Sequence, residues 1–101
     1  MEPIFHITEA ARWHAATATG QYTDSTRGKT VAEEGFIHCS FEDQVAEIGR
    51  LVYGDLAEPL VLLTIDPSRV EPEIKVERGY PHIYGALAAD AVVAVQPFHV
   101  P

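Results

Sequence analysis

The sequence predicts an α+β fold with an antiparallel-rich β-sheet and two helices. Two segments with helical patterns occupy the first half of the chain, and four strand-like segments follow one another in the second half. Strands that succeed one another without intervening helices are typical of α+β proteins and not of doubly wound sheets. With 101 residues, 47% of them hydrophobic, residues 1–101 are expected to form a single domain.

The N-terminal segment is expected to be a strand followed by a helix. Residues 3–8 (PIFHIT) have the composition of a short strand, and residues 9–18 are rich in alanine and free of glycine and proline. Thr8 is the expected N-cap of this helix, and Gly20 is its expected end.

Residues 19–34 form the least regular stretch of the chain. They contain two glycines, many hydroxyl groups and no sustained periodicity. A loop of this length in a small domain is typical of a lid or a binding loop. The alternative is a loop with a short helix near residues 30–34.

The motif GFIHCS, residues 35–40, indicates a strand that leads into the second helix. Ser40 is the expected N-cap of a helix over residues 41–53, with Asp43 in the position of a capping-box carboxylate. One apolar stripe of this helix is expected from the spacing of Val45, Ile48, Leu51 and Val52.

Four strand segments are expected in the second half of the chain: residues 59–66, 73–77, a part of 78–87, and 91–98. The unbroken apolar run in the first of them indicates a central strand that is covered on both faces. In the second, alternation directs Ile74 and Val76 inward.

Composition excludes several classes of function. Fifteen acidic and seven basic residues give a net charge of −8, which argues against nucleic-acid binding but leaves room for a small anionic ligand. Cys39 is the only cysteine, which suits a reducing compartment. No apolar signal follows Met1, and the longest apolar run is too short to span a bilayer, so a cytoplasmic protein without a membrane partner is expected.

Three segments repeat a histidine, an apolar residue and a hydroxyl residue: His6-Ile7-Thr8, His38-Cys39-Ser40 and His82-Ile83-Tyr84. On a strand, residues two apart share a face, so each segment directs its histidine and hydroxyl to one side and its apolar residue to the core. The hypothesis is that the three imidazoles converge on one solvent-reachable hollow. The alternative is that they are half-buried strand histidines bonded to their neighbours.

Three kinds of chemistry fit such a polar face. An open zinc site of three histidines is disfavoured, because the sequence has no H-x-x-x-H spacing. A nucleophile at Ser40 or Cys39 would need a histidine within about 3 Å, there is no G-x-S-x-G elbow, and Cys39 is better interpreted as a structural thiol.

The third kind is a hydrogen-bonding cleft for a nucleotide. Histidines and hydroxyl groups can bind ribose, because each can donate or accept a hydrogen bond. Aromatic residues that could stack on a base are Trp13, Tyr22, Tyr80 and Tyr84. Arg27 and Lys29, in the irregular stretch, could contact phosphates.

The order of motifs, "IFHIT", "GFIHCS", "LVLLTID" and "YPHIYG", is similar to that of a bacterial and plant family known as domain of unknown function nine-five-two. This resemblance implies an ADP-ribosyltransferase-like fold, with a split β-sheet that binds nicotinamide dinucleotide (NAD) in a central cleft. It also implies that His6 holds a ribose, and that His38 and Ser40 lie near the nicotinamide. Glu77 is the candidate for the glutamate that stabilises the oxocarbenium-like centre, and a solvated strand carboxylate is the alternative.

The resulting hypothesis is a cleft that binds NAD or a related nucleotide and either transfers ADP-ribose or cleaves the nicotinamide–ribose bond. The candidate catalytic residues are His38, Ser40 and Glu77, and the candidate ligand-binding residues are His6, Thr8, Trp13, Tyr22, His82 and Tyr84. The expected cofactor is NAD, no metal is expected, and the expected partner is a nucleotide-like small molecule. The alternative is a non-enzymatic module that binds a small ligand or a peptide in the same cleft.

Overall fold

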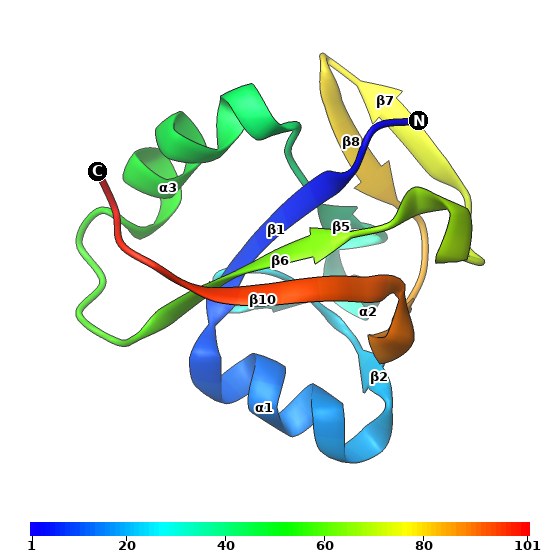
Figure 1. Cartoon of the computed structure of the whole chain (residues 1–101), viewed down its shortest axis with the longest axis horizontal. Coiled ribbons are helices and arrows are strands. Elements are labelled where there is room, and N and C mark those ends of the chain that lie inside the picture. The colour runs from blue at the N-terminus through cyan, green and yellow to red at the C-terminus, as the bar shows by residue number, and fades with distance from the viewer.

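The computed structural model describes residues 1–101 and contains antiparallel sheets with helices at their edges (Figure 1). The strands are β1 (Ile4–Glu9), β2 (Gln21–Tyr22), β3 (Asp24–Thr26), β4 (Lys29–Thr30), β5 (Ile37–His38), β6 (Leu60–Ile65), β7 (Ile74–Glu77), β8 (Tyr80–Ile83), β9 (Leu87–Ala88) and β10 (Val92–Phe98). The helices are α1 (Ala10–Thr19), α2 (Val31–Glu34) and α3 (Val45–Tyr53), with 3₁₀ turns at Glu42–Gln44, Pro67–Arg69 and Ala89–Ala91. The predicted α+β class is confirmed, and the likeness to ADP-ribosyltransferases stays a prediction.

The first three-stranded sheet has the order β1-β6-β10 and is antiparallel throughout. The apolar strand β6 is central, as its sequence predicts, and its Leu63 and Ile65 are fully buried. They belong to a core cluster that continues into the second sheet and into α1: Ile4, Ala16, Tyr22, Ile37, Cys39, Leu63, Ile65, Ile83, Leu87 and Ala91.

The second three-stranded sheet has the order β5-β8-β7, and it carries two of the three repeated motifs. Its register pairs His38 with His82 and His82 with Lys75, so these three side chains form one row across one face. The next pair along, Ile37 and Ile83, lies on the opposite face and is fully buried. Alternation therefore separates a core face from a polar face.

The predicted strand 35–40 is a short strand that links the two sheets. Cys39 N donates to Pro81 O at 3.0 Å, which extends the pairing with β8. Ser40 then pairs with Phe5 of β1, through backbone hydrogen bonds of 2.7 and 2.8 Å. This segment therefore passes from one sheet to the other and places Ser40 between them.

Gly20 ends α1 as predicted, with φ of 82°, a conformation that glycine adopts without strain. The predicted N-cap Thr8 is wrong: Glu9 occupies that position without a side-chain capping hydrogen bond, and the Thr8 side chain is buried in β1. The predicted Ser40 cap is also wrong, because the 3₁₀ turn starts one residue later and the Gln44 side chain accepts from Phe41 N.

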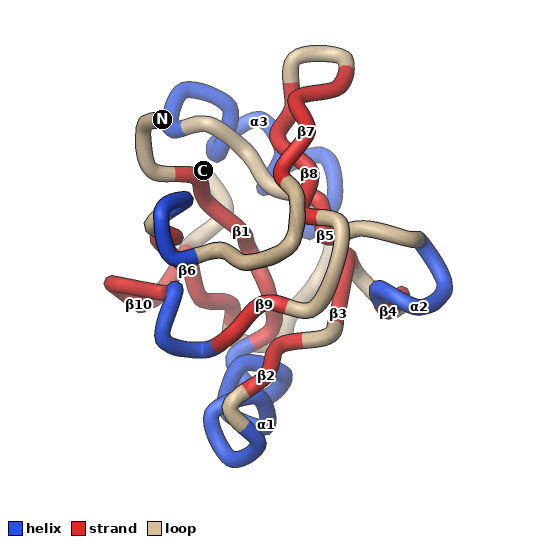
Figure 2. Tube along the Cα trace, turned by 90° about the vertical axis from the view of Figure 1, so that its right-hand side faces the viewer, coloured by secondary structure: helices blue, strands red, loops and turns tan.

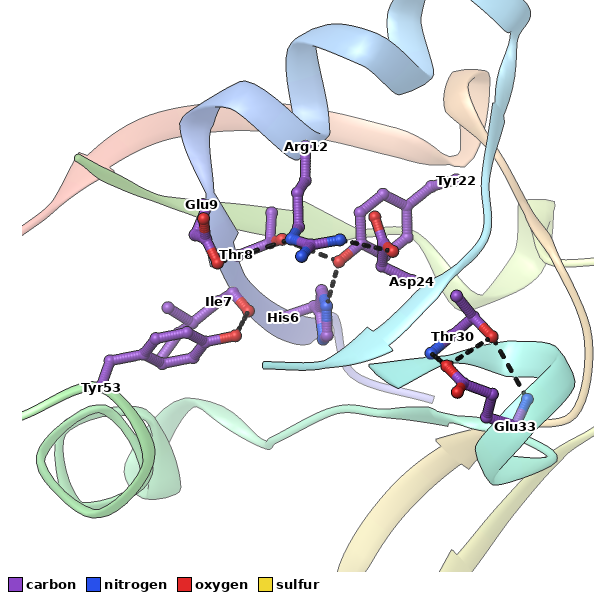
Figure 3. Close-up of polar contacts among 10 residues, drawn as sticks. All are labelled: His6, Ile7, Thr8, Glu9, Arg12, Tyr22, Asp24, Thr30, Glu33 and Tyr53. Atoms are coloured by element: carbon purple, nitrogen blue, oxygen red, sulfur yellow. Dashed lines mark hydrogen bonds and ion pairs between the residues drawn. The ribbon is translucent and has the colours of Figure 1, made fainter. Parts of the chain in front are cut away.

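The irregular stretch 19–34 contains the short strands β2, β3 and β4, and it ends in the short helix α2 at the position of the alternative interpretation. Thr30 and Glu33 form a reciprocal capping box at the start of α2 (Figure 3).

The β7–β8 hairpin projects beyond the rest of the molecule (Figure 2). Val76, predicted to point inward, is 52% exposed because it lies near the tip of this edge hairpin. No helix has both the length and the apolar character that a bilayer crossing requires.

Candidate functional site

A cavity of about 280 Å³ opens between the polar face of the second sheet and helix α3. The predicted residues His6, His38, Ser40 and His82 all line it. The opposite wall is apolar and comes mainly from Ile48, Leu51 and Val52, on the stripe that the helical spacing predicts. The cavity therefore combines an apolar wall with a wall of hydrogen-bonding groups.

His82 is oriented by a carboxylate next to it on the sheet. Its Nδ1 donates to Glu77 Oε1 at 2.8 Å, and the Tyr84 hydroxyl donates to the same oxygen. The Tyr84 and His82 hydrogen bonds lower the pKa of Glu77, and the bond to Glu77 raises the pKa of Tyr84. With Nδ1 held in this way, Nε2 is the nitrogen of His82 that is left for a ligand.

His38 has a similar arrangement with the opposite nitrogen. Its Nε2 lies 3.1 Å from Glu34 Oε1, so Nδ1 is left for a ligand. The rings of His38 and His82 are 5.3 Å apart, and Phe36 stacks on His82 with centroids 4.2 Å apart. Two imidazoles, each held by a carboxylate, are thus fixed side by side at the cavity wall.

Ser40 lines the cavity beside these histidines. No histidine lies within hydrogen-bond distance of Ser40 Oγ or Cys39 Sγ, so the condition set for a hydrolase with either nucleophile is not met. Cys39 belongs to the buried core, and burial raises the pKa of its thiol, which confirms the structural interpretation of this residue.

His6 also lines the cavity, and both of its ring nitrogens form hydrogen bonds within the protein. Figure 3 shows the bond to Tyr22. Nδ1 is 2.5 Å from the His38 carbonyl, which can only accept, so Nδ1 carries the proton. Nε2 is 2.7 Å from the Tyr22 hydroxyl, which in turn lies 2.8 Å from Thr8 Oγ1. Burial lowers the pKa of His6 to about 4.

The remaining predicted ligand-binding residues lie away from the cavity lining. Thr8 and Tyr22 are 1% exposed, so Tyr22 lies in the core and not where it could stack on a bound base. Trp13 packs against the same core and is tilted against Tyr22. Tyr84 and Glu77 do not line the cavity either, and they approach it only through His82.

The zinc site weighed from the sequence is not formed. Both ring nitrogens of His6 are engaged, and no group of three histidine, cysteine, aspartate or glutamate side chains could hold a metal ion. The repeated pattern of histidine, apolar residue and hydroxyl therefore corresponds to two different arrangements. His6 belongs to a buried chain of hydrogen bonds, whereas His38 and His82 lie on the polar face of a sheet.

Substitution of Tyr22 by phenylalanine is expected to cost about 1–3 kcal/mol of unfolding free energy. The change leaves the buried Nε2 of His6 and the Thr8 hydroxyl without their shared partner. Urea unfolding measures the loss, with Tyr80→Phe as the control, because Tyr80 is half-buried and its hydroxyl forms no internal hydrogen bond. Equal stability of the two variants would contradict this assignment.

Sequence reasoning missed several residues of the site. Thr26 lines the cavity, and Glu34 and Phe36 hold the histidines. Tyr80, one of the aromatic residues considered for stacking on a base, also lines the cavity. The sequence contains a signal for Glu34, since it precedes His38 by four residues at the end of the short helix that was the alternative interpretation of residues 30–34. Thr26 carried no signal, because its position depends on how the β3–β4 hairpin folds back over the chain.

The chain matches the family model described as "Protein of unknown function (DUF952)" over residues 7–95. Solved structures of protein CC0527 from Caulobacter crescentus are similar to it. The crystal structure has a TM-score of 0.81 at 27% sequence identity, covering 96% of this chain and 86% of that one. The solution NMR structure has a TM-score of 0.69 at 30% identity, covering 95% and 84%. A comparison with curated proteins gives no match.

Proposed function

Because the chain belongs to the DUF952 family, whose function is unknown, we propose a function from the site itself: binding of NAD or a related nucleotide, and cleavage of its nicotinamide–ribose bond. The observation that carries this proposal is the His82–Glu77 hydrogen bond of 2.8 Å at the cavity wall. Because this bond engages Nδ1, His82 has a defined free nitrogen, Nε2, that can act as a base, and the Glu77 carboxylate supports it.

The size and walls of the cavity support a flat ring as the enclosed part of the ligand. Ligand sites typically measure about 300–1,000 Å³, so 280 Å³ suits a ring with its ribose and not a whole dinucleotide. The ring would pack on Leu51 and Val52 of α3. His38 Nδ1 and the Ser40 hydroxyl would bind the amide end, as the resemblance implies.

The proposed reaction breaks the bond between the pyridinium nitrogen and the ribose carbon. The bonding electron pair leaves on nicotinamide, which becomes neutral, and positive charge remains on the ribose. Water or another hydroxyl acceptor adds to that carbon and transfers its proton to His82 Nε2. Glu77 orients His82 and stabilises the imidazolium that forms, in the way a carboxylate supports a catalytic histidine elsewhere.

The ADP-ribosyltransferase-like fold forms part of this proposal. Two antiparallel sheets that meet at Ser40, with the cavity beside their junction, are compatible with a split sheet. A cytoplasmic setting, where NAD is available and the single thiol stays reduced, is also proposed.

The second candidate is a binding module that catalyses nothing. It is favoured by Leu51, which is 77% exposed at the cavity and could contact a peptide. A carboxylate placed beside the histidines favours catalysis over this alternative.

Calorimetric titration with NAD, with free nicotinamide measured in parallel, separates the two candidates. We expect heat of binding together with release of nicotinamide. Heat without nicotinamide would favour the binding module, and neither signal from folded protein would overturn the proposed function.

A further inference from the structure

One cation lies at the edge of the cavity, in the turn between β3 and β4. Arg27 Nη1 donates to the Val52 carbonyl at 3.1 Å and to Asp55 Oδ1 at 2.6 Å. Val52 and Thr26, the residue before Arg27, both line the cavity. The guanidinium therefore lies where the β3–β4 hairpin meets the end of α3.

Arg27 keeps most of its hydrogen-bonding capacity available. Both of its contacts use Nη1, so Nε and Nη2 remain as donors. Its partner Asp55 is 80% exposed, and exposed ion pairs contribute little to stability. An anionic group of a ligand can therefore compete for the guanidinium, whose planar fork matches two oxygens of a phosphate.

No residue with a permanent positive charge lines the cavity itself. None of its lining residues is lysine or arginine, and the whole chain has a net charge of −8. A ligand with a phosphate would therefore be repelled unless a local cation receives it.

We infer that Arg27 binds the phosphate next to the ribose of the ligand and so selects phosphorylated nucleotides over nucleosides. This inference rests on the proposed function and deepens it. The enclosed ring and ribose occupy the cavity, and the phosphate leaves it past the β3–β4 turn. Asp55 competes with that phosphate for the same guanidinium.

The test compares two probes that differ by one phosphate, nicotinamide riboside and nicotinamide mononucleotide, by calorimetry. Wild-type protein is expected to bind the mononucleotide roughly tenfold more tightly, since a charged hydrogen-bonding partner contributes about that much. Arg27→Ala is expected to remove this preference and leave the affinity for the riboside unchanged. Arg27→Lys, which keeps the charge but not the fork, is expected to be intermediate.

Two variants control for general charge and for competition. Arg50→Ala removes an exposed arginine from α3 and is expected to leave the preference intact. Asp55→Asn is expected to increase it, and no change with this variant would count against the role of Asp55 as a competitor.

The outcomes distinguish failure of the inferred role of Arg27 from failure of the proposed function. If the riboside binds but the mononucleotide binds no better, or if Arg27→Ala weakens both equally, the role of Arg27 is overturned and the proposed function stands. If folded protein binds neither probe, both are overturned.

Discussion

Substitution of Glu77 by glutamine is expected to lower the rate of nicotinamide release by about 100-fold or more, while NAD still binds. Glutamine keeps the shape of the side chain but removes its charge. Its amide can also turn its NH₂ group toward His82, and this would shift the proton of the imidazole to Nε2. The ring would then no longer accept the proton of the attacking hydroxyl.

The measurement is the single-turnover rate of nicotinamide release, together with calorimetric affinity and the melting temperature. Glu71→Gln is the matched control, because Glu71 is exposed and lies outside the sheet and the cavity. A Glu77→Gln variant that is as fast as wild type would show that Glu77 is a solvated strand carboxylate, the alternative considered from the sequence.

Acidification from pH 6.5 to pH 4 is expected to cost about 3 kcal/mol of unfolding free energy through His6 alone. Burial lowers the pKa of His6 from 6.5 to about 4, so the folded state resists protonation. In the unfolded chain the same ring takes up a proton below pH 6.5. The unfolded state therefore binds more protons in this window, and stability falls as the pH falls, at about 1.4 kcal/mol per pH unit.

Urea unfolding at several pH values tests this expectation by comparison with His6→Gln. That variant should be less stable at pH 7 but should lack the component of the pH dependence that comes from His6. His14→Gln, at an exposed position of α1, should retain the wild-type dependence. Equal dependence in wild type and His6→Gln would contradict the neutral, buried state of His6.

Patterns that depend on neighbours along the chain were reliable guides to the fold. The alanine-rich helix ended by Gly20, the apolar helix α3 and the central strand β6 all follow from local periodicity. The errors occur where tertiary contacts prevail. Thr8 is a good N-cap by type, but its hydroxyl is satisfied by Tyr22 in the core. Val76 fits the alternating pattern of its strand, but it is exposed because no part of the core packs against it there.

The sequence predicted where the candidate site lies better than it predicted the role of each residue in it. Alternation along the strands placed His38, Ser40 and His82 on the polar face, and in the structure they line one cavity together with His6. The alternation of side chains along a strand does not show which imidazole already has hydrogen-bond partners within the protein. The buried bond from His6 to Tyr22 joins residues 16 positions apart, and the Arg27–Asp55 pair joins residues 28 apart. Such pairings depend on how the hairpins pack.

The most direct measurement is an NMR titration that follows all five imidazoles while nicotinamide riboside is added to the protein. If the cavity is the binding site, the ring signals of His38 and His82 shift with the ligand, while those of the exposed His14 and His99 stay in place. Signals of His38 and His82 that do not move at saturating ligand, or shifts confined to His14 and His99, would contradict it.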